Sequence, residues 1–170
     1  IYLFDSRYSF NQLGVDEEKY PNLKTDFKKY IDENDLIPAN FKNVIEPILC
    51  TKIANKNGIT VSTVEHLMAA FYGEGIDNAL VEIDAPEVPI LDGSAKVFID
   101  KIISSGFEVS NSPIKVIKIN KEIKYSKGER FISIKPSTLS LYIDFELKYK
   151  NKIIGNQRNK IKVYEDDLRD

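Results

Sequence analysis

The feature that most constrains this fold is the uneven distribution of helix-like and strand-like sequence along the chain. Two apolar segments with helical spacing, near 62–73 and 94–104, lie before residue 111. From Asn111-Ser112-Pro113 onward only short alternating segments follow, separated by turn signals at Lys127-Gly128 and Pro136-Ser137. The pattern therefore predicts an α+β chain with a domain boundary near Asn111-Ser112-Pro113.

Residues 1–111 are expected to form a first domain, in which both helices lay one apolar face on a β-sheet. The opening run 1–4 and the segment 79–83 have strand-like sequences. Another strand should contain 48–53, directly before the strong turn signal at 55–58. The first domain should therefore have two layers, one of sheet and one of two helices.

A polar and charged stretch near residues 6–40 interrupts this first domain. It includes the runs Lys28-Lys29-Tyr30 and Asp32-Glu33-Asn34-Asp35. We interpret the stretch as an insertion on the surface of the domain, helical around 24–31.

The first helix is predicted to begin at Ser62, in the sequence Ser62-Thr63-Val64-Glu65-His66-Leu67. A serine followed three residues later by glutamate has the pattern of a capping box. In this motif the serine side chain accepts from the backbone N–H of the glutamate, and the glutamate side chain accepts from the backbone N–H of the serine. Gly73 and Gly75 should end this helix.

The second helix is predicted to run from about Ser94 to Ser104, after a turn at Asp92-Gly93-Ser94. Gly106 should end it. Its apolar side chains share one face: Val97, Phe98, Ile102 and Ile103.

Residues 112–170 are expected to form an incomplete second domain of mostly antiparallel strands. Its alternating segments lie at 114–119, 123–125, 131–135 and 139–149. Without a helix to cover one sheet face, this part has too little core for an independent domain. We therefore expect it to need a partner or the missing remainder of its own domain. The whole chain is expected to be a piece of a longer protein.

The composition excludes several classes of protein. The 170 residues are 42% apolar, enough for a buried core, and their formal net charge of -2 offers no basic field for a nucleic acid. No apolar run approaches the roughly 20 residues that span a bilayer, and no secretory leader is recognisable. Cys50 is the single cysteine, which suits a reducing compartment. We expect a cytoplasmic protein, or one of an organelle matrix if the source is eukaryotic.

The only histidine of the chain, His66, directly follows a carboxylate, Glu65. A histidine that could bind a metal beside a base is half of a hydrolytic site, but a catalytic zinc normally has three protein ligands. From the residues alone, Glu65 is more often a capping carboxylate, His66 a packing or surface histidine, and Cys50 a small buried side chain. These alternatives stay open at this point.

Three consecutive stretches of sequence resemble one enzyme family. They are Ser62-Thr63-Val64-Glu65-His66-Leu67-Met68-Ala69-Ala70, Gly75-Ile76-Asp77-Asn78 and the run from Glu82-Ile83-Asp84-Ala85-Pro86 to Asp92-Gly93-Ser94-Ala95. Together they closely resemble the zinc-dependent UDP-3-O-acyl-N-acetylglucosamine deacetylases of lipid A biosynthesis. The resemblance implies two similar domains, each a sheet backed by two helices as in the ribosomal protein S5 domain 2-like fold. By this resemblance we expect the chain to hold the first domain without its first strands, and the opening strands of the second.

The resemblance also implies roles for the residues around the helix start. His66 is similar to one of the family's three zinc ligands, and Glu65 to the general base that takes a proton from a water activated by zinc. Leu49 and Cys50, in a stretch similar to the family's active-site strand, would line the site near the metal.

Two residues of the second part resemble family positions that hold the nucleotide-sugar lipid precursor. Phe145 would pack its ring on the substrate and Arg130 would supply charge. The family usually has lysine at the position of Arg130, and a planar guanidinium is not equivalent to a point charge. The sequence Glu46-Pro47-Ile48 also departs from the Asp-Thr pair that is usual in the family.

The resemblance places the other two zinc ligands beyond residue 170. We therefore expect this chain alone to bind zinc weakly and not to hydrolyse substrate. The leading hypothesis is a portion of a zinc-dependent amide hydrolase that releases acetate from UDP-3-O-acyl-N-acetylglucosamine. The alternative is a non-catalytic structural or binding module descended from that enzyme, which the departures at Arg130 and the insertion would suit.

Overall fold

The computed structural model describes residues 2–4, 34–45, 48–106, 109, 113, 116–138 and 141–163. The chain divides into two compact units, residues 1–113 and 114–168. Within these described ranges no helix is long and apolar enough to cross a membrane. The predicted α+β class is confirmed, because both helices and several sheets are present.

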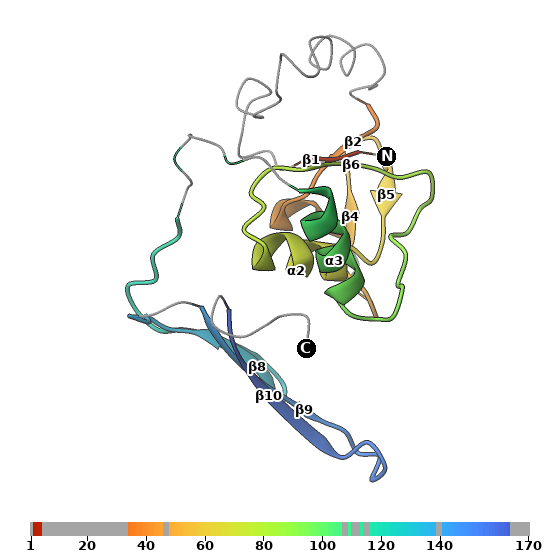
Figure 1. The fold of residues 1–170 in the computed structure, drawn as a ribbon. Coiled ribbons are helices and arrows are strands. Elements are labelled where there is room, and N and C mark those ends of the chain that lie inside the picture. Colours follow the sequence, from red (N-terminus) through yellow and green to blue (C-terminus); the bar gives the residue numbers. More distant parts are fainter. Residues whose placement is uncertain are drawn as a thin grey trace. The chain divides into compact units, whose positions relative to one another are not determined.

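Two small sheets form the strand layer of the first unit (Figure 1). In one sheet, β1 (Tyr2–Phe4) lies between β2 (Leu36–Pro38), which is parallel to it, and β6 (Leu80–Glu82), which is antiparallel. The other sheet contains the antiparallel strands β3 (Val44–Ile45), β4 (Lys52–Ala54) and β5 (Thr60–Val61). A single 3-10 turn, η2 (Phe41–Asn43), joins β2 to β3.

The helices α2 (Glu65–Gly73) and α3 (Lys96–Ser105) lie side by side (Figure 1). The core between helices and strands is a cluster of buried side chains from β2, β4, β5, α2, the residue before α2 and the loop after β6: Ile37, Ile53, Val61, Val64, Leu67 and Val88. Burial of these side chains is the main stabilising contribution to the unit.

The surface insertion predicted near 6–40 is wrong at its end. Residues 36–38 form β2 inside a sheet, and the side chain of Ile37 is 0% exposed. The sequence did not indicate this strand, because three residues flanked by polar ones are too few to show an alternating pattern. The helix predicted around 24–31 lies outside the described residues.

The strand predicted at 48–53 begins later than expected. Residues 48–50 are bent, and Leu49 has a φ of 66°, which interrupts extended backbone. Only Lys52–Ala54 pairs as a strand. The turn predicted at 55–58 is confirmed, since the Gly58 N–H donates to the Asn55 carbonyl oxygen over 3.2 Å.

The predicted capping box at the start of α2 is wrong. The helix begins at Glu65, after Val64, and has no side-chain cap. The N–H of Ser62 donates instead to the Pro86 carbonyl oxygen, because Ser62 pairs with a neighbouring segment rather than with its own helix. The end of α2 is as predicted: Gly75 has a φ of 67°, and the Ile76 N–H donates to the Phe71 carbonyl oxygen, as in a Schellman motif.

The second helix, α3, begins two residues later than predicted. Before it, the Asp92 carboxylate accepts hydrogen bonds from the Ser94 N–H and hydroxyl, which lower the pKa of Asp92. The Ser94 hydroxyl accepts from the Lys96 N–H, so the predicted turn is confirmed. The apolar face differs in detail, since Ile99 is fully buried while Ile103 is 45% exposed.

The second unit consists of two antiparallel hairpins in the ranges that the structure describes. One joins β7 (Ile123–Lys127) to β8 (Arg130–Ile134), and the other joins β9 (Tyr142–Lys148) to β10 (Asn156–Lys162). Residues 116–119 are not a strand, contrary to prediction, and β10 was not predicted.

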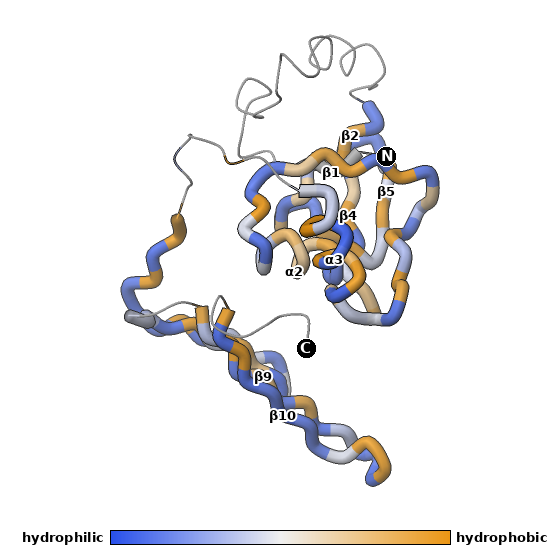
Figure 2. Tube along the Cα trace, in the orientation of Figure 1, coloured by the Kyte–Doolittle hydropathy of each residue, from blue (hydrophilic) through white to orange (hydrophobic). Residues whose placement is uncertain are grey.

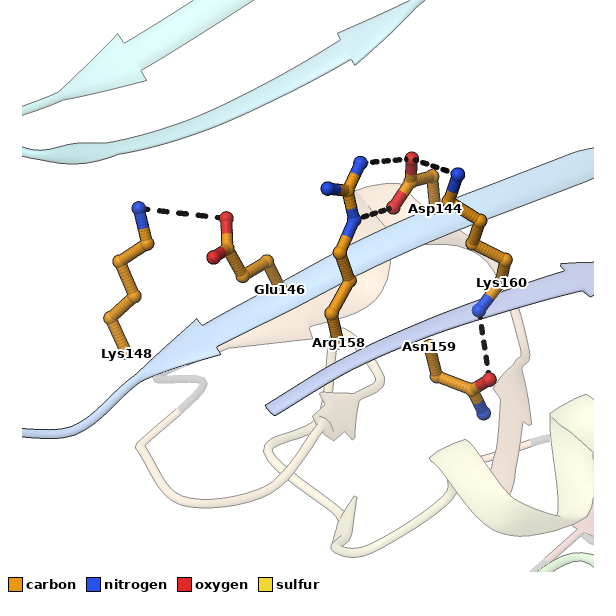
Figure 3. Close-up of polar contacts among 6 residues, drawn as sticks. All are labelled: Asp144, Glu146, Lys148, Arg158, Asn159 and Lys160. Carbon is orange, nitrogen blue, oxygen red and sulfur yellow. Dashed lines mark hydrogen bonds and ion pairs between the residues drawn. The ribbon is translucent and has the colours of Figure 1, made fainter. Parts of the chain in front are cut away.

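Apolar and polar residues are interleaved along β9 and β10 (Figure 2). The described residues leave the apolar side chains of the first hairpin largely uncovered: Phe131 and Ile132 of β8 are 66% and 69% exposed. Polar contacts instead fix the second hairpin (Figure 3). Arg158 donates from Nε and Nη2 to the two carboxylate oxygens of Asp144, at 2.8 and 2.7 Å, and this diagonal cross-strand pair lowers the pKa of Asp144.

Candidate active site at the start of α2

Glu65 and His66 are the first two residues of α2, and both are partly buried. The Glu65 carboxylate accepts, at Oε2, a hydrogen bond of 2.9 Å from the backbone N–H of Thr51. The Thr51 carbonyl oxygen in turn accepts from the Val64 N–H at 3.3 Å. These two bonds hold the segment before β4 against the helix start, so the orientation of the Glu65 carboxylate is fixed by a residue 14 positions away in the sequence.

The turn that precedes α2 is held from its other side by the loop after β6. Ser62 and Glu87 form a parallel bridge, in which the Ser62 N–H donates to Pro86 and the Val88 N–H donates to Ser62, both at 3.0 Å. Between these bonds, the Thr63 hydroxyl donates to Oε1 of Glu87 at 2.6 Å. The helix start is therefore connected to two segments distant in sequence.

Sequence reasoning missed the backbone N–H of Thr51 and the side chains of Thr63 and Glu87. Thr63 is 5% exposed and has a φ of 59°, a conformation that is rare for a β-branched residue. No residue pattern predicts such a conformation, because propensity favours glycine or asparagine there. The one available signal was the position of Glu87 in a proline-bounded turn, which indicates a rigid loop.

Leu49 and Cys50 directly precede Thr51, and so they lie on the segment that is bonded to Glu65. The side chain of Leu49 is fully exposed, and the Cys50 thiol is free and partly buried. The positive φ of Leu49 turns the chain just before the Thr51 contact. The structure thus brings the segment that bears these two predicted residues to the start of α2.

Metal binding by these residues would involve few donors. His66 is the only histidine of the chain, and the described residues contain no group of three or more His, Cys, Asp or Glu side chains that could hold a metal ion. Because a catalytic zinc uses three protein ligands, the described residues do not form such a site by themselves. His66 can provide one imidazole ligand, with a carboxylate next to it in sequence.

The remaining two predicted residues lie in the second unit, on different hairpins. Arg130 begins β8 and pairs in register with Lys127, and its side chain is exposed. Phe145 lies on β9 opposite Asn159 and is 43% exposed. Both side chains are accessible to a ligand.

Comparison with known proteins decides the family. The family model described as UDP-3-O-acyl N-acetylglycosamine deacetylase matches residues 23–170. The chain belongs to this family. The resemblance carried by the residues around Glu65 and His66 is thereby confirmed at the level of the deacetylase family.

Several curated relatives bear the name UDP-3-O-acyl-N-acetylglucosamine deacetylase. The protein of Shewanella violacea is 39% identical over 127 residues, which are 75% of this chain and 41% of the relative. That of Histophilus somni is 42% identical over 118 residues, 69% of this chain and 38% of the relative. That of Vibrio campbellii is 36% identical over 138 residues, 81% of this chain and 44% of the relative. The chain thus spans about two fifths of the length of these deacetylases.

Proposed function

We propose that this chain is the part of a zinc-dependent deacetylase that supplies the general base, Glu65, and one metal ligand, His66. The complete enzyme would remove acetate from UDP-3-O-acyl-N-acetylglucosamine in lipid A biosynthesis, the substrate that the names of the relatives give. The observation that carries the proposal is the hydrogen bond from the Thr51 N–H to Glu65, which fixes the carboxylate of the residue that directly precedes His66 in a deacetylase-family chain.

The two oxygens of the Glu65 carboxylate have different roles in this proposal. Among the described residues, Thr51 donates to Oε2, and Oε1 receives no hydrogen bond. Oε1 can therefore accept the proton of a water molecule, while the bond at Oε2 prevents rotation of the carboxylate. A zinc ion bound with His66 would supply Lewis acidity to that water and to the substrate carbonyl.

The other predicted residues would bind substrate. Leu49 and Cys50 are proposed to line the site near the metal, because they adjoin Thr51. Arg130 and Phe145 are proposed to hold the nucleotide sugar by charge and by ring packing, and their exposure suits this role.

We also propose a specific fold for the two parts of the chain. Residues 1–111 would form the first of two similar domains of the ribosomal protein S5 domain 2-like fold, and residues 112–170 the start of the second. The exposed apolar faces of β8 and β9 support this, since they would be covered by the remainder of the second domain.

The proposed function is tested with the full-length protein by measuring acetate release and bound zinc. Glu65→Gln should lower the rate by at least about 100-fold, as expected for loss of a general base, and should retain zinc. His66→Ala should lose both zinc and activity. Glu82→Gln, which changes an exposed glutamate of β6, is the matched control and should change neither.

The 170-residue chain alone is expected to bind zinc weakly and to release no acetate, because it has one histidine. Activity of the chain alone at the rate of the full-length protein would contradict the proposed origin of the other ligands. A full-length protein that neither binds zinc nor hydrolyses substrate would instead support a non-catalytic module descended from the enzyme.

A further inference from the structure

The contact between Thr63 and Glu87 lies two residues before the proposed base. The Thr63 side chain is 5% exposed, and its hydroxyl donates to Oε1 of Glu87 at 2.6 Å. Glu87 comes from the loop after β6, 24 residues further along the chain. A hydroxyl donor and a carboxylate acceptor at this distance form a charge-assisted hydrogen bond, which is stronger than a bond between neutral groups.

The backbone of Thr63 is strained. Its φ of 59° is in the left-handed region, which costs a residue other than glycine free energy and costs a β-branched residue most. Such a conformation persists only where the surrounding structure holds it, and strained residues of this kind cluster at functional sites. Here the Glu87 carboxylate holds the side chain, and the bridge between Ser62 and Glu87 holds the preceding backbone.

The conformation of Thr63 determines where the next two residues lie. The N–H of Val64 reaches the Thr51 carbonyl oxygen, and the carboxylate of Glu65 reaches the Thr51 N–H. Both bonds to Thr51 therefore depend on the direction in which the chain leaves Thr63. If Thr63 relaxed to an ordinary φ, Glu65 would move relative to Thr51.

We propose that Thr63 and Glu87 are positioning residues for Glu65: their hydrogen bond keeps the strained turn in the one conformation that aligns the Glu65 carboxylate with the Thr51 N–H. This inference rests on the proposed function for its effect on catalysis. Its structural part, the dependence of the Thr51–Glu65 bond on Glu87, does not. Neither Thr63 nor Glu87 needs to touch the substrate.

The first experiment measures deacetylation by the full-length protein. Glu87→Ala and Thr63→Ala should lower kcat by about tenfold or more, the scale expected for a misplaced catalytic group, and should leave KM within about twofold. Glu87→Gln keeps an oxygen acceptor for the Thr63 hydroxyl, and Thr63→Ser keeps a hydroxyl donor for Glu87. Both variants should therefore retain most of the rate. Glu82→Ala, on β6, is the matched control and should have no effect.

A double variant separates positioning from general destabilisation. In a Glu65→Ala background the carboxylate to be positioned is absent, so Glu87→Ala should lower the residual rate by less than about twofold, whereas a structural role would give the same loss in both backgrounds. An equal loss in both backgrounds would overturn the proposal. So would an unchanged kcat in Glu87→Ala.

The second experiment does not depend on activity. In the full-length protein labelled with ¹⁵N-threonine, the Thr51 amide proton reports its hydrogen bond to Glu65. Its resonance should shift toward that of the Glu65→Ala protein when Glu87 is replaced by Ala, and should stay in place in Glu87→Gln. An unchanged Thr51 resonance in Glu87→Ala would refute the positioning role. If the wild type shows no deacetylation, the proposed function fails, and the Thr51 resonance alone decides this inference.

Discussion

Replacing Ile37 by alanine should destabilise the first unit strongly, although the surrounding sequence is polar. Ile37 is 0% exposed and belongs to the core cluster that joins β2 to β4, β5 and α2. The change removes three carbon atoms, and at about 0.8 kcal/mol for each the transfer contribution is about 2.4 kcal/mol. The cavity left behind adds to this, and the total should fall between about 2 and 5 kcal/mol.

The assay is urea unfolding of the protein, followed by far-UV circular dichroism because the chain has no tryptophan. The matched control is Ile90→Ala, in the loop after β6, since this isoleucine is 54% exposed and should cost less than about 0.5 kcal/mol. Equal midpoints for Ile37→Ala and the wild type would refute the placement of residues 36–38 in the core. They would restore the interpretation of that segment as part of a surface insertion.

Three further predictions concern local contacts. Arg158→Gln should raise the pKa of Asp144 toward its ordinary value, and an unchanged carboxyl ¹³C titration would contradict the ion pair. Because the folded pKa of Asp144 is depressed, its carboxylate stabilises the hairpin at pH values above the unfolded pKa, and this stabilisation is lost as the pH falls through the folded pKa. Gly75→Ala should lower the free energy of unfolding by about 1 kcal/mol, measured by thermal unfolding: no atom lies within 4 Å of an added Cβ, but the φ of 67° is unfavourable for a residue that has one. Gly75→Asn should cost less, and equal losses would count against the Schellman motif. Ser94→Ala should raise the pKa of Asp92 through loss of the hydroxyl bond, and no change in the titration of Asp92 would argue against the turn.

Elements whose signals are local could be predicted from the sequence. Gly75 ends α2 as expected, and the asparagine-rich turn before Gly58 forms because the Asn55 side chain accepts from the N–H groups of Asn57 and Ile59. The bonding of Ser62 before α2 could not be predicted, since its N–H bonds to the Pro86 carbonyl oxygen rather than to the Glu65 side chain. A tertiary contact here replaced the local capping pattern.

The same distinction applies to the candidate site. The position of Glu65 and His66 at a helix start followed from the apolar run after them. The partner of Glu65 could not be predicted, because a backbone N–H 14 residues earlier carries no side-chain signature. The positive φ of Thr63 could not be predicted either, since it opposes the local preference of a β-branched residue. The proposed chemical roles came from the resemblance to the deacetylases.

The pairing of β1 with β2 has a consequence for how proteins of this kind can vary. Both ends of the connection from Phe4 to Leu36 are fixed by neighbouring positions in one sheet. The entropic cost of closing such a connection rises slowly with its length, by about 0.6 kcal/mol for each doubling. The connection between these two strands can therefore be made longer or shorter at little thermodynamic cost, while Ile37 keeps its place in the core cluster.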